Sequence, residues 1–139
     1  MTQQKNSVKQ DAKQFLNMIE RRNRRIDAML QTADGYIKKA RRGNVMNTET
    51  LNTFINLAAE LQQESVELRK SVEKARKAIK GLGNEDEKLF IELRYFHGLK
   101  IESIANVMRC SPARVYRIQT STIKHVQELI DAGLVDTDV

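Results

Sequence analysis

The chain has 139 residues, with 24 Lys or Arg against 18 Asp or Glu, so its formal net charge is +6 at neutral pH. This length fits one domain, or a small module joined to a helical extension, and the positive charge favours an acidic partner such as nucleic acid. Because there are only 6 Gly and 1 Pro, the chain has too few turn formers for a β-sandwich or β-barrel. We therefore expect an all-α fold.

Cysteine content and hydropathy indicate in which cellular compartment the chain is expected. The single cysteine, Cys110, excludes an internal disulfide and a multi-cysteine zinc site, and it suits a reducing environment. No apolar run approaches the roughly 18 residues of a membrane span, and the polar N-terminus lacks the apolar core of a secretory signal. We expect a cytoplasmic protein without a membrane partner.

The sequence contains no pattern typical of a catalytic or metal site. His97 and His125 lie in different predicted elements without a Cys or a carboxylate pair at ligand spacing, so we expect no bound metal. No phosphate-binding loop, nucleophile elbow or paired-carboxylate pattern is present. We therefore predict no catalytic residues and no cofactor, and conclude that the chain is not an enzyme.

Apolar periodicity predicts two long helices in the N-terminal half. Over residues 8–40 apolar side chains recur every three or four residues, with Asp34-Gly35 as a weak point and Gly43-Asn44 as the end. A second helix starts after Asn47 or Thr48. Its apolar seam alternates steps of three and four in a heptad pattern through Leu51, Phe54, Ala58, Leu61, Ser65, Leu68, Val72, Ala75, Ile79 and Leu82. A short connection makes such helices antiparallel neighbours.

The second helix carries more apolar surface than one neighbour can cover. Ile55, Leu57 and Ala59 lie outside the seam, which indicates a second partner helix. We therefore predict that residues 1–80 form a helical hairpin or coiled-coil region that makes a homodimer. The residues expected at the dimer contact are Leu51, Ile55, Leu57, Leu61, Leu68 and Val72.

A new module begins where Gly81 and Gly83 break the heptads. Asn84 can cap the next helix, with Glu87 at the capping-box position, and Leu89, Leu93 and Phe96 form the expected apolar face. Two further helices follow, one over residues 101–108 and one that opens at Ser111-Pro112 and ends near residue 129 or 130. Residues 131–139 look like a frayed tail.

The last two predicted helices are typical of a helix-turn-helix within residues 84–130. Ala105 is small where the second helix must cross closely, and four basic residues but no acidic one lie between Glu102 and Glu128. The second helix would therefore present a positive surface to base edges and phosphates in the major groove. Its expected DNA-facing residues are Ser111, Ala113, Arg114, Tyr116, Arg117, Thr120, Ser121 and Lys124.

Two segments carry a family resemblance. Residues 92–105, ELRYFHGLKIESIA, and 111–118, SPARVYRI, resemble region four of bacterial sigma factors. With the preceding helices, the arrangement is similar to phage-encoded late transcription regulators of the ArpU and RinA kind. The resemblance implies binding to double-stranded DNA near a promoter, activation of late phage or prophage genes in a bacterial host, and RNA polymerase as a further partner.

The chain departs from this pattern at two positions. Lys100 stands where a capping Ser or Thr is usual, and Arg109 stands where the turn usually has Gly. We expect Arg109 to adopt a left-handed or otherwise strained conformation at a cost on the order of 1 kcal/mol. Such a change in the turn would alter the angle at which the second helix meets DNA.

Two other functions fit the same elements. A small terminase subunit for phage DNA packaging also combines a helix-turn-helix with oligomerising helices, although its DNA-binding helices tend to come first. A coiled-coil adaptor that binds RNA polymerase would use the sigma-like module on protein instead of DNA. The sequence alone leaves open the DNA site, the sign of regulation and any effector.

Overall fold

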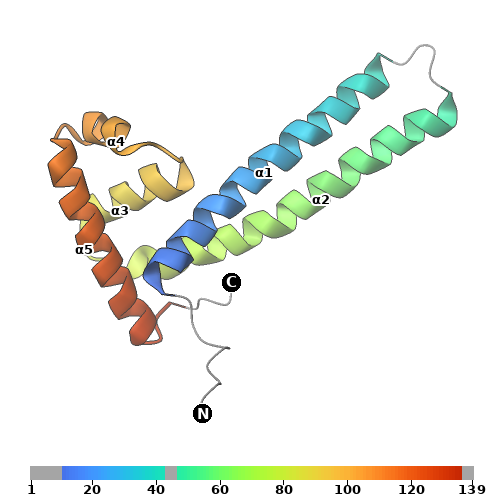
Figure 1. Ribbon diagram of the computed structural model, residues 1–139. Helices are drawn as coiled ribbons and strands as arrows, with labels where there is room; N and C mark the ends of the chain where they lie inside the picture. The colour runs from blue at the N-terminus through green and yellow to red at the C-terminus, as the bar shows by residue number, and fades with distance from the viewer. Residues whose placement is uncertain (1–10, 43–46, 136–139) are drawn as a thin grey trace. The chain divides into compact units, whose positions relative to one another are not determined.

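The computed structural model describes residues 11–42 and 47–135, and every regular element in these ranges is helical (Figure 1). This confirms the all-α prediction. The long helices are α1 (Ala12–Arg41) and α2 (Thr48–Ala78), which continues into the 3-10 turn η2 (Ile79–Gly81). The remaining elements are α3 (Glu85–Ile91), the π-helical turn η3 (Glu92–Phe96), α4 (Ile101–Met108) and α5 (Pro112–Asp131). None of the described helices is long and apolar enough to cross a membrane.

Side-chain caps explain where the long helices begin. Asp11 Oδ1 accepts a hydrogen bond from the Gln14 amide at 2.8 Å, and Gln14 Oε1 accepts one from the Asp11 amide at 3.0 Å, which is a capping box. Asn47 Oδ1 accepts from the Thr50 amide at 2.7 Å, so α2 starts as predicted. The helix α1 continues through Gly35, whereas the predicted start at Val8 and the stop at Gly43-Asn44 lie outside the described residues.

The chain divides into two compact units, and the division differs from the predicted boundary at residues 80–84. Within the described residues, the core unit comprises residues 11–21 and 72–135, and the hairpin unit comprises residues 22–42 and 47–71. The start of α1 therefore belongs with the C-terminal helices. The physical reason is a shared hydrophobic cluster in which Phe15, Leu16 and Ile19 of α1 join Phe90 and Ile91 of α3, all of them buried.

The C-terminal end of α5 is tied into the core unit. Gln127 Oε1 accepts a hydrogen bond from the Ala12 amide at 2.9 Å and thereby satisfies an amide at the start of α1. Beyond α5, Gly133 has a φ of 74° and the Leu134 amide donates to the Leu129 carbonyl, which closes the helix end. Val135 is buried, so residues 131–135 are not a frayed tail. The rest of the predicted tail, residues 136–139, lies outside the described residues.

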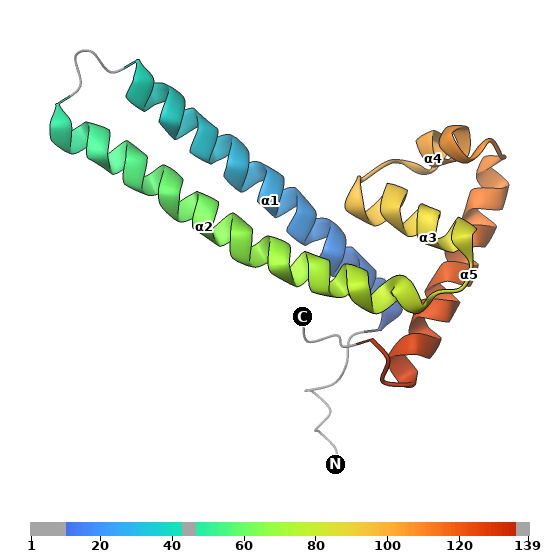
Figure 2. The same ribbon diagram turned by 180° about the vertical axis from the view of Figure 1, so that it is seen from behind.

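In the hairpin unit, α1 and α2 lie side by side and antiparallel (Figures 1 and 2). Burial follows the predicted seam, because Ala58 and Ser65 of α2 are buried and Tyr36 of α1 stacks on Phe54 at 5.8 Å between ring centroids. Arg22 Nη1 also donates a hydrogen bond to Ser71 Oγ. Pairing of the helices within one chain thus covers most of this seam.

The predicted dimerisation residues differ in exposure. Ile55 is 49% exposed and Leu57 is 36% exposed, whereas Leu51, Leu61 and Leu68 are half-buried. Val72 is buried inside the core unit. A second chain would therefore meet chiefly the flank at Ile55 and Leu57, and association of two chains stays a prediction.

The apolar face predicted for α3 is wrong in part. Leu93 and Phe96 are half-buried, but Leu89 is 41% exposed, and the buried side chains are Phe90, Ile91 and Tyr95. Within α3, ordinary helical spacing puts Glu87, Phe90 and Ile91 on the packed side and leaves Leu89 outside it. The wider spacing of the π-helical turn η3 then brings Tyr95, five residues after Phe90, onto that same side. The Phe90 and Tyr95 rings meet edge to face with 6.0 Å between centroids.

Candidate nucleic-acid interface

The helices α4 and α5 form the predicted helix-turn-helix at one end of the core unit (Figures 1 and 2). Ile104 and Ala105 of α4 and Val115 and Ile118 of α5 are all buried at the crossing. Ala105 is only 3% exposed, which agrees with the expectation that a small side chain is needed there. This packing fixes the direction of α5.

The turn between these helices has the strained residue that the sequence indicates. Arg109 has φ 55° and ψ 49°, in the left-handed region, and it is the only described non-glycine residue with positive φ. Its conformation lets the Cys110 amide donate to the Ala105 carbonyl at 3.0 Å, while the half-buried Cys110 side chain packs on the core. Lys100 precedes α4 without a side-chain cap, as expected.

The start of α5 is specified by two adjacent residues. Ser111 Oγ accepts a hydrogen bond from the Arg114 amide at 3.2 Å, and Pro112 occupies the first helical position. Of the predicted DNA-facing set, Ser121 is half-buried. The other members are exposed, namely Ser111, Ala113, Arg114, Tyr116, Arg117, Thr120 and Lys124.

The exposed cations of α5 differ in their partners. Arg114 Nη2 lies 3.4 Å from Asp86 Oδ2 of α3, and both side chains are more than half exposed. An exposed pair of this kind contributes at most about 1 kcal/mol, so a DNA phosphate can replace Asp86. Neither Arg117 nor Lys124 forms an ion pair with another residue in the described ranges. The positive surface therefore centres on Arg117 and Lys124.

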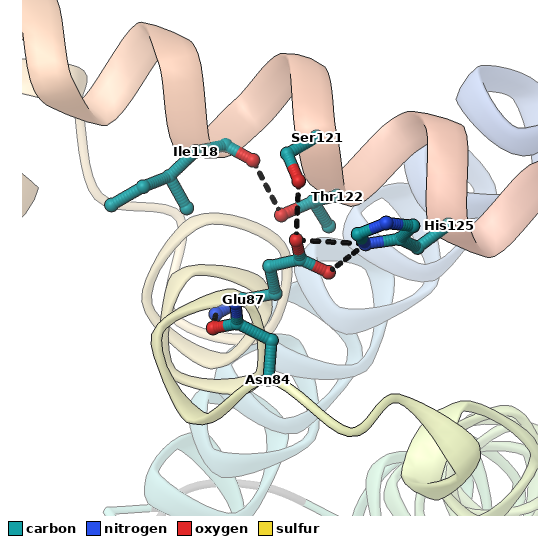
Figure 3. Close-up of polar contacts among 6 residues, drawn as sticks. All are labelled: Asn84, Glu87, Ile118, Ser121, Thr122 and His125. Carbon is teal, nitrogen blue, oxygen red and sulfur yellow. Dashed lines mark hydrogen bonds and ion pairs between the residues drawn. The ribbon is translucent and has the colours of Figure 1, made fainter.

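A polar cluster that the sequence did not predict lies behind this surface. Asn84 Oδ1 accepts from the Glu87 amide at 3.2 Å, so Asn84 is the expected cap. The Glu87 carboxylate does not reach back to complete a capping box, however, and accepts hydrogen bonds from Ser121 Oγ at 2.5 Å and His125 Nδ1 at 2.8 Å instead (Figure 3). His125 thus has an acidic partner that no local spacing signals, because Glu87 lies on another helix.

The described residues contain no group of three or more His, Cys, Asp and Glu side chains arranged to hold a metal ion. The polar groups near α5 are instead hydrogen-bonded to each other or exposed on its surface. Thr120 Oγ1, for example, donates to the Tyr116 carbonyl within the helix at 3.1 Å. The arrangement is therefore suited to binding by complementary charge and hydrogen bonds.

Comparison with known proteins adds one finding. The family model described as ECF sigma factor matches residues 10–124, a range that includes both long helices, α3, α4 and most of α5. No curated protein and no solved structure gives a match. The matched range contains the helix-turn-helix and ends at Lys124, the last residue of the predicted DNA-facing set.

Proposed function

The chain belongs to the ECF sigma factor family, which implies a role in DNA binding and transcription, and we propose that it is a sequence-specific transcriptional regulator that reads double-stranded DNA with α5. The finer role that we propose is activation of late phage or prophage genes near their promoters, in the cytoplasm of the bacterial host. The resemblance of residues 92–105 and 111–118 to sigma region four supports this role.

The observation that carries the proposal is the exposed basic face of α5. Arg117 and Lys124 project from a helix whose direction is held by the buried crossing at Ala105, and neither is neutralised by a described residue. A guanidinium can pair bidentately with guanine in the major groove, whereas an ammonium is a point charge suited to phosphate. The face therefore offers groups for base reading and for backbone binding.

We propose different tasks for the two cations, on the basis of their spacing along the helix. Lys124 follows Arg117 by seven residues, which is about 10 Å along the helix axis. When Arg117 reaches the floor of the major groove, Lys124 has moved toward the edge, where phosphates lie. We therefore assign sequence discrimination to Arg117 and sequence-independent affinity to Lys124.

Substitution of the two residues tests this function. A preferred duplex is first selected from a random DNA pool, and affinities for it and for a scrambled duplex are then measured by fluorescence anisotropy at several salt concentrations. Arg117→Ala should cost about 1 to 3 kcal/mol on the preferred duplex and relax one base preference. Lys124→Ala should weaken both duplexes alike and reduce the slope of log affinity against log salt by about 1. Arg69→Ala, at an exposed position of the hairpin unit, is the matched control.

An unchanged ratio of preferred to scrambled affinity in Arg117→Ala would contradict the assignment of α5 as the reading helix. Failure of the wild-type chain to prefer any duplex would contradict the function itself. Genome-wide binding during phage induction then tests the finer role, which requires occupancy at the promoter of a late operon.

We also propose RNA polymerase as a partner, because the family match includes both long helices as well as the helix-turn-helix. Mixing the chain with core RNA polymerase, with and without the selected duplex, separates a regulator from an adaptor. A regulator retains DNA binding in the absence of polymerase. An adaptor binds polymerase but prefers no duplex.

A further inference from the structure

Glu87 links α3 to the reading helix by a buried carboxylate that is 2% exposed. A buried carboxylate is unfavourable unless it is hydrogen-bonded and paired, and Ser121 and His125 supply these partners. Because an ionised carboxylate has only acceptor atoms, the hydrogen between it and His125 must be on Nδ1. The outward ring nitrogen is then Nε2, which points away from Glu87 in Figure 3.

His125 lies at the edge of the positive face of α5. Its side chain is 43% exposed, whereas that of Glu87 is buried behind it. The imidazole also lines a shallow hollow on the surface of α5, together with Tyr116, Arg117, Thr120, Ser121 and Lys124. The pair therefore connects the buried side of α5 to the surface that is proposed to meet DNA.

We propose that His125 is a further DNA-contacting residue, whose Nε2 donates a hydrogen bond to a backbone phosphate, and that Glu87 is the positioning residue that orients it. This inference rests on the proposed function. His125 follows Arg117 by eight residues, or about 12 Å along the helix, and is adjacent to Lys124, so phosphate is the chemical group expected at its position.

The contact requires a charged imidazole ring. Phosphate oxygens accept hydrogen bonds, so Nε2 must carry a hydrogen in addition to the one on Nδ1. The Glu87 carboxylate on one side and the phosphate on the other then each accept one of the two ring N–H groups. DNA binding is therefore coupled to protonation of His125, and affinity falls as pH rises.

Several other charged side chains lie beside α5, near the His125 ring. A second hollow adjoins the one lined by His125. The other charged side chains that line these two hollows are Glu87 and Asp86 from α3, and Arg114, Arg117 and Lys124 from α5 itself. Three cations and two carboxylates therefore lie along these hollows. Neither α4 nor η2 contributes a lining residue to these hollows. Glu87 is the acid in direct contact with the ring, so its removal should have the largest effect.

The test uses His125→Asn, because the Asn Nδ2 can take the place of Nδ1 and still donate to Glu87, while Nε2 and the charge are lost. Anisotropy titrations on the selected duplex between about pH 5 and pH 8 cover the range in which histidine titrates. At the acidic end we expect about three- to tenfold weaker binding and a salt slope reduced by about 1. At the alkaline end the difference should vanish. His97→Asn, at an exposed position, should bind as the wild type does.

A second variant, Glu87→Met, tests the positioning role, because Met is close to Glu in size but offers the ring no carboxylate oxygen as acceptor. Without that contact the ring is no longer held toward the phosphate, so at the acidic end Glu87→Met should bind about as weakly as His125→Asn, and adding it to His125→Asn should weaken binding no further. Wild-type affinity in folded Glu87→Met, or an equal loss with and without His125, would overturn the role of Glu87, and equal binding by His125→Asn and wild type throughout would overturn the DNA contact. Weak binding by Arg117→Ala alongside normal binding by His125→Asn overturns this inference only, whereas failure of the wild type to prefer any duplex overturns the proposed function as well.

Discussion

Phe15→Ala tests whether the start of α1 is part of the DNA-binding unit. Phe15 is fully buried in the same cluster as Phe90 and Val115, although it is far from both in sequence. Truncation of a buried phenylalanine to alanine typically costs about 3 to 5 kcal/mol. This is a large fraction of the roughly 5 to 15 kcal/mol that stabilises an ordinary domain. We therefore expect substantial loss of the free energy of unfolding and weaker DNA binding, with no change on the DNA face itself.

Urea denaturation gives the magnitude, and hydrogen exchange read by mass spectrometry gives the location. Amides of α5 around Val126 and Ile130, which are buried in the same cluster, should lose protection together with those at the start of α1. Val66→Ala, at an exposed position of the hairpin unit outside the predicted dimer contact, should change stability by less than about 0.5 kcal/mol. If Phe15→Ala increased exchange in α1 and left α5 fully protected, the assignment of α1 to the core unit would be refuted.

Three further predictions concern strain, alkaline stability and association. Arg109→Gly should raise the free energy of unfolding by about 0.5 to 1 kcal/mol, because relief of left-handed strain exceeds the entropic cost of glycine, and a lower melting temperature would contradict it. Burial raises the pKa of Tyr95 above its usual 10.0, while the smaller effect of the Arg94 charge lowers it and that of the Glu20 charge raises it, so folding favours the neutral phenol. The contribution of the neutral Tyr95 phenol to the free energy of unfolding is complete below about pH 10 and is lost as pH rises through the pKa of Tyr95 in the folded chain. Tyr95→Phe should abolish this part of the alkaline loss in thermal melts. Light scattering should give a dimer mass for the wild type and a monomer mass for Ile55→Asp, since that side chain is exposed; a monomeric wild type would refute the dimer.

Local patterns in the sequence were sufficient to predict the helix-turn-helix. The Ser111-Pro112 start of α5, the cap at Asn84 and the left-handed Arg109 each depend on residues within a few positions of one another. The burial of Ala105 follows likewise from the short turn that brings α5 over α4. Such features are readable because backbone sterics and capping act over one helical turn.

The tertiary structure decided what depends on contacts between distant parts of the chain. Glu87 and His125 are separated by 38 positions, and Ala12 and Gln127 by 115, so no periodicity relates the members of either pair. The exposure of Leu89 was likewise decided by which side of α3 packs on the cluster, and the burial of Tyr95 by the π-helical turn. Helical periodicity in the sequence indicates that one face of a helix is apolar. Which other element covers that face depends on how the helices pack together. For that reason the sequence could predict α5 and its exposed basic residues, whereas the buried Glu87 carboxylate behind α5 and the contribution of α1 to the shared hydrophobic cluster could be seen only in the folded chain.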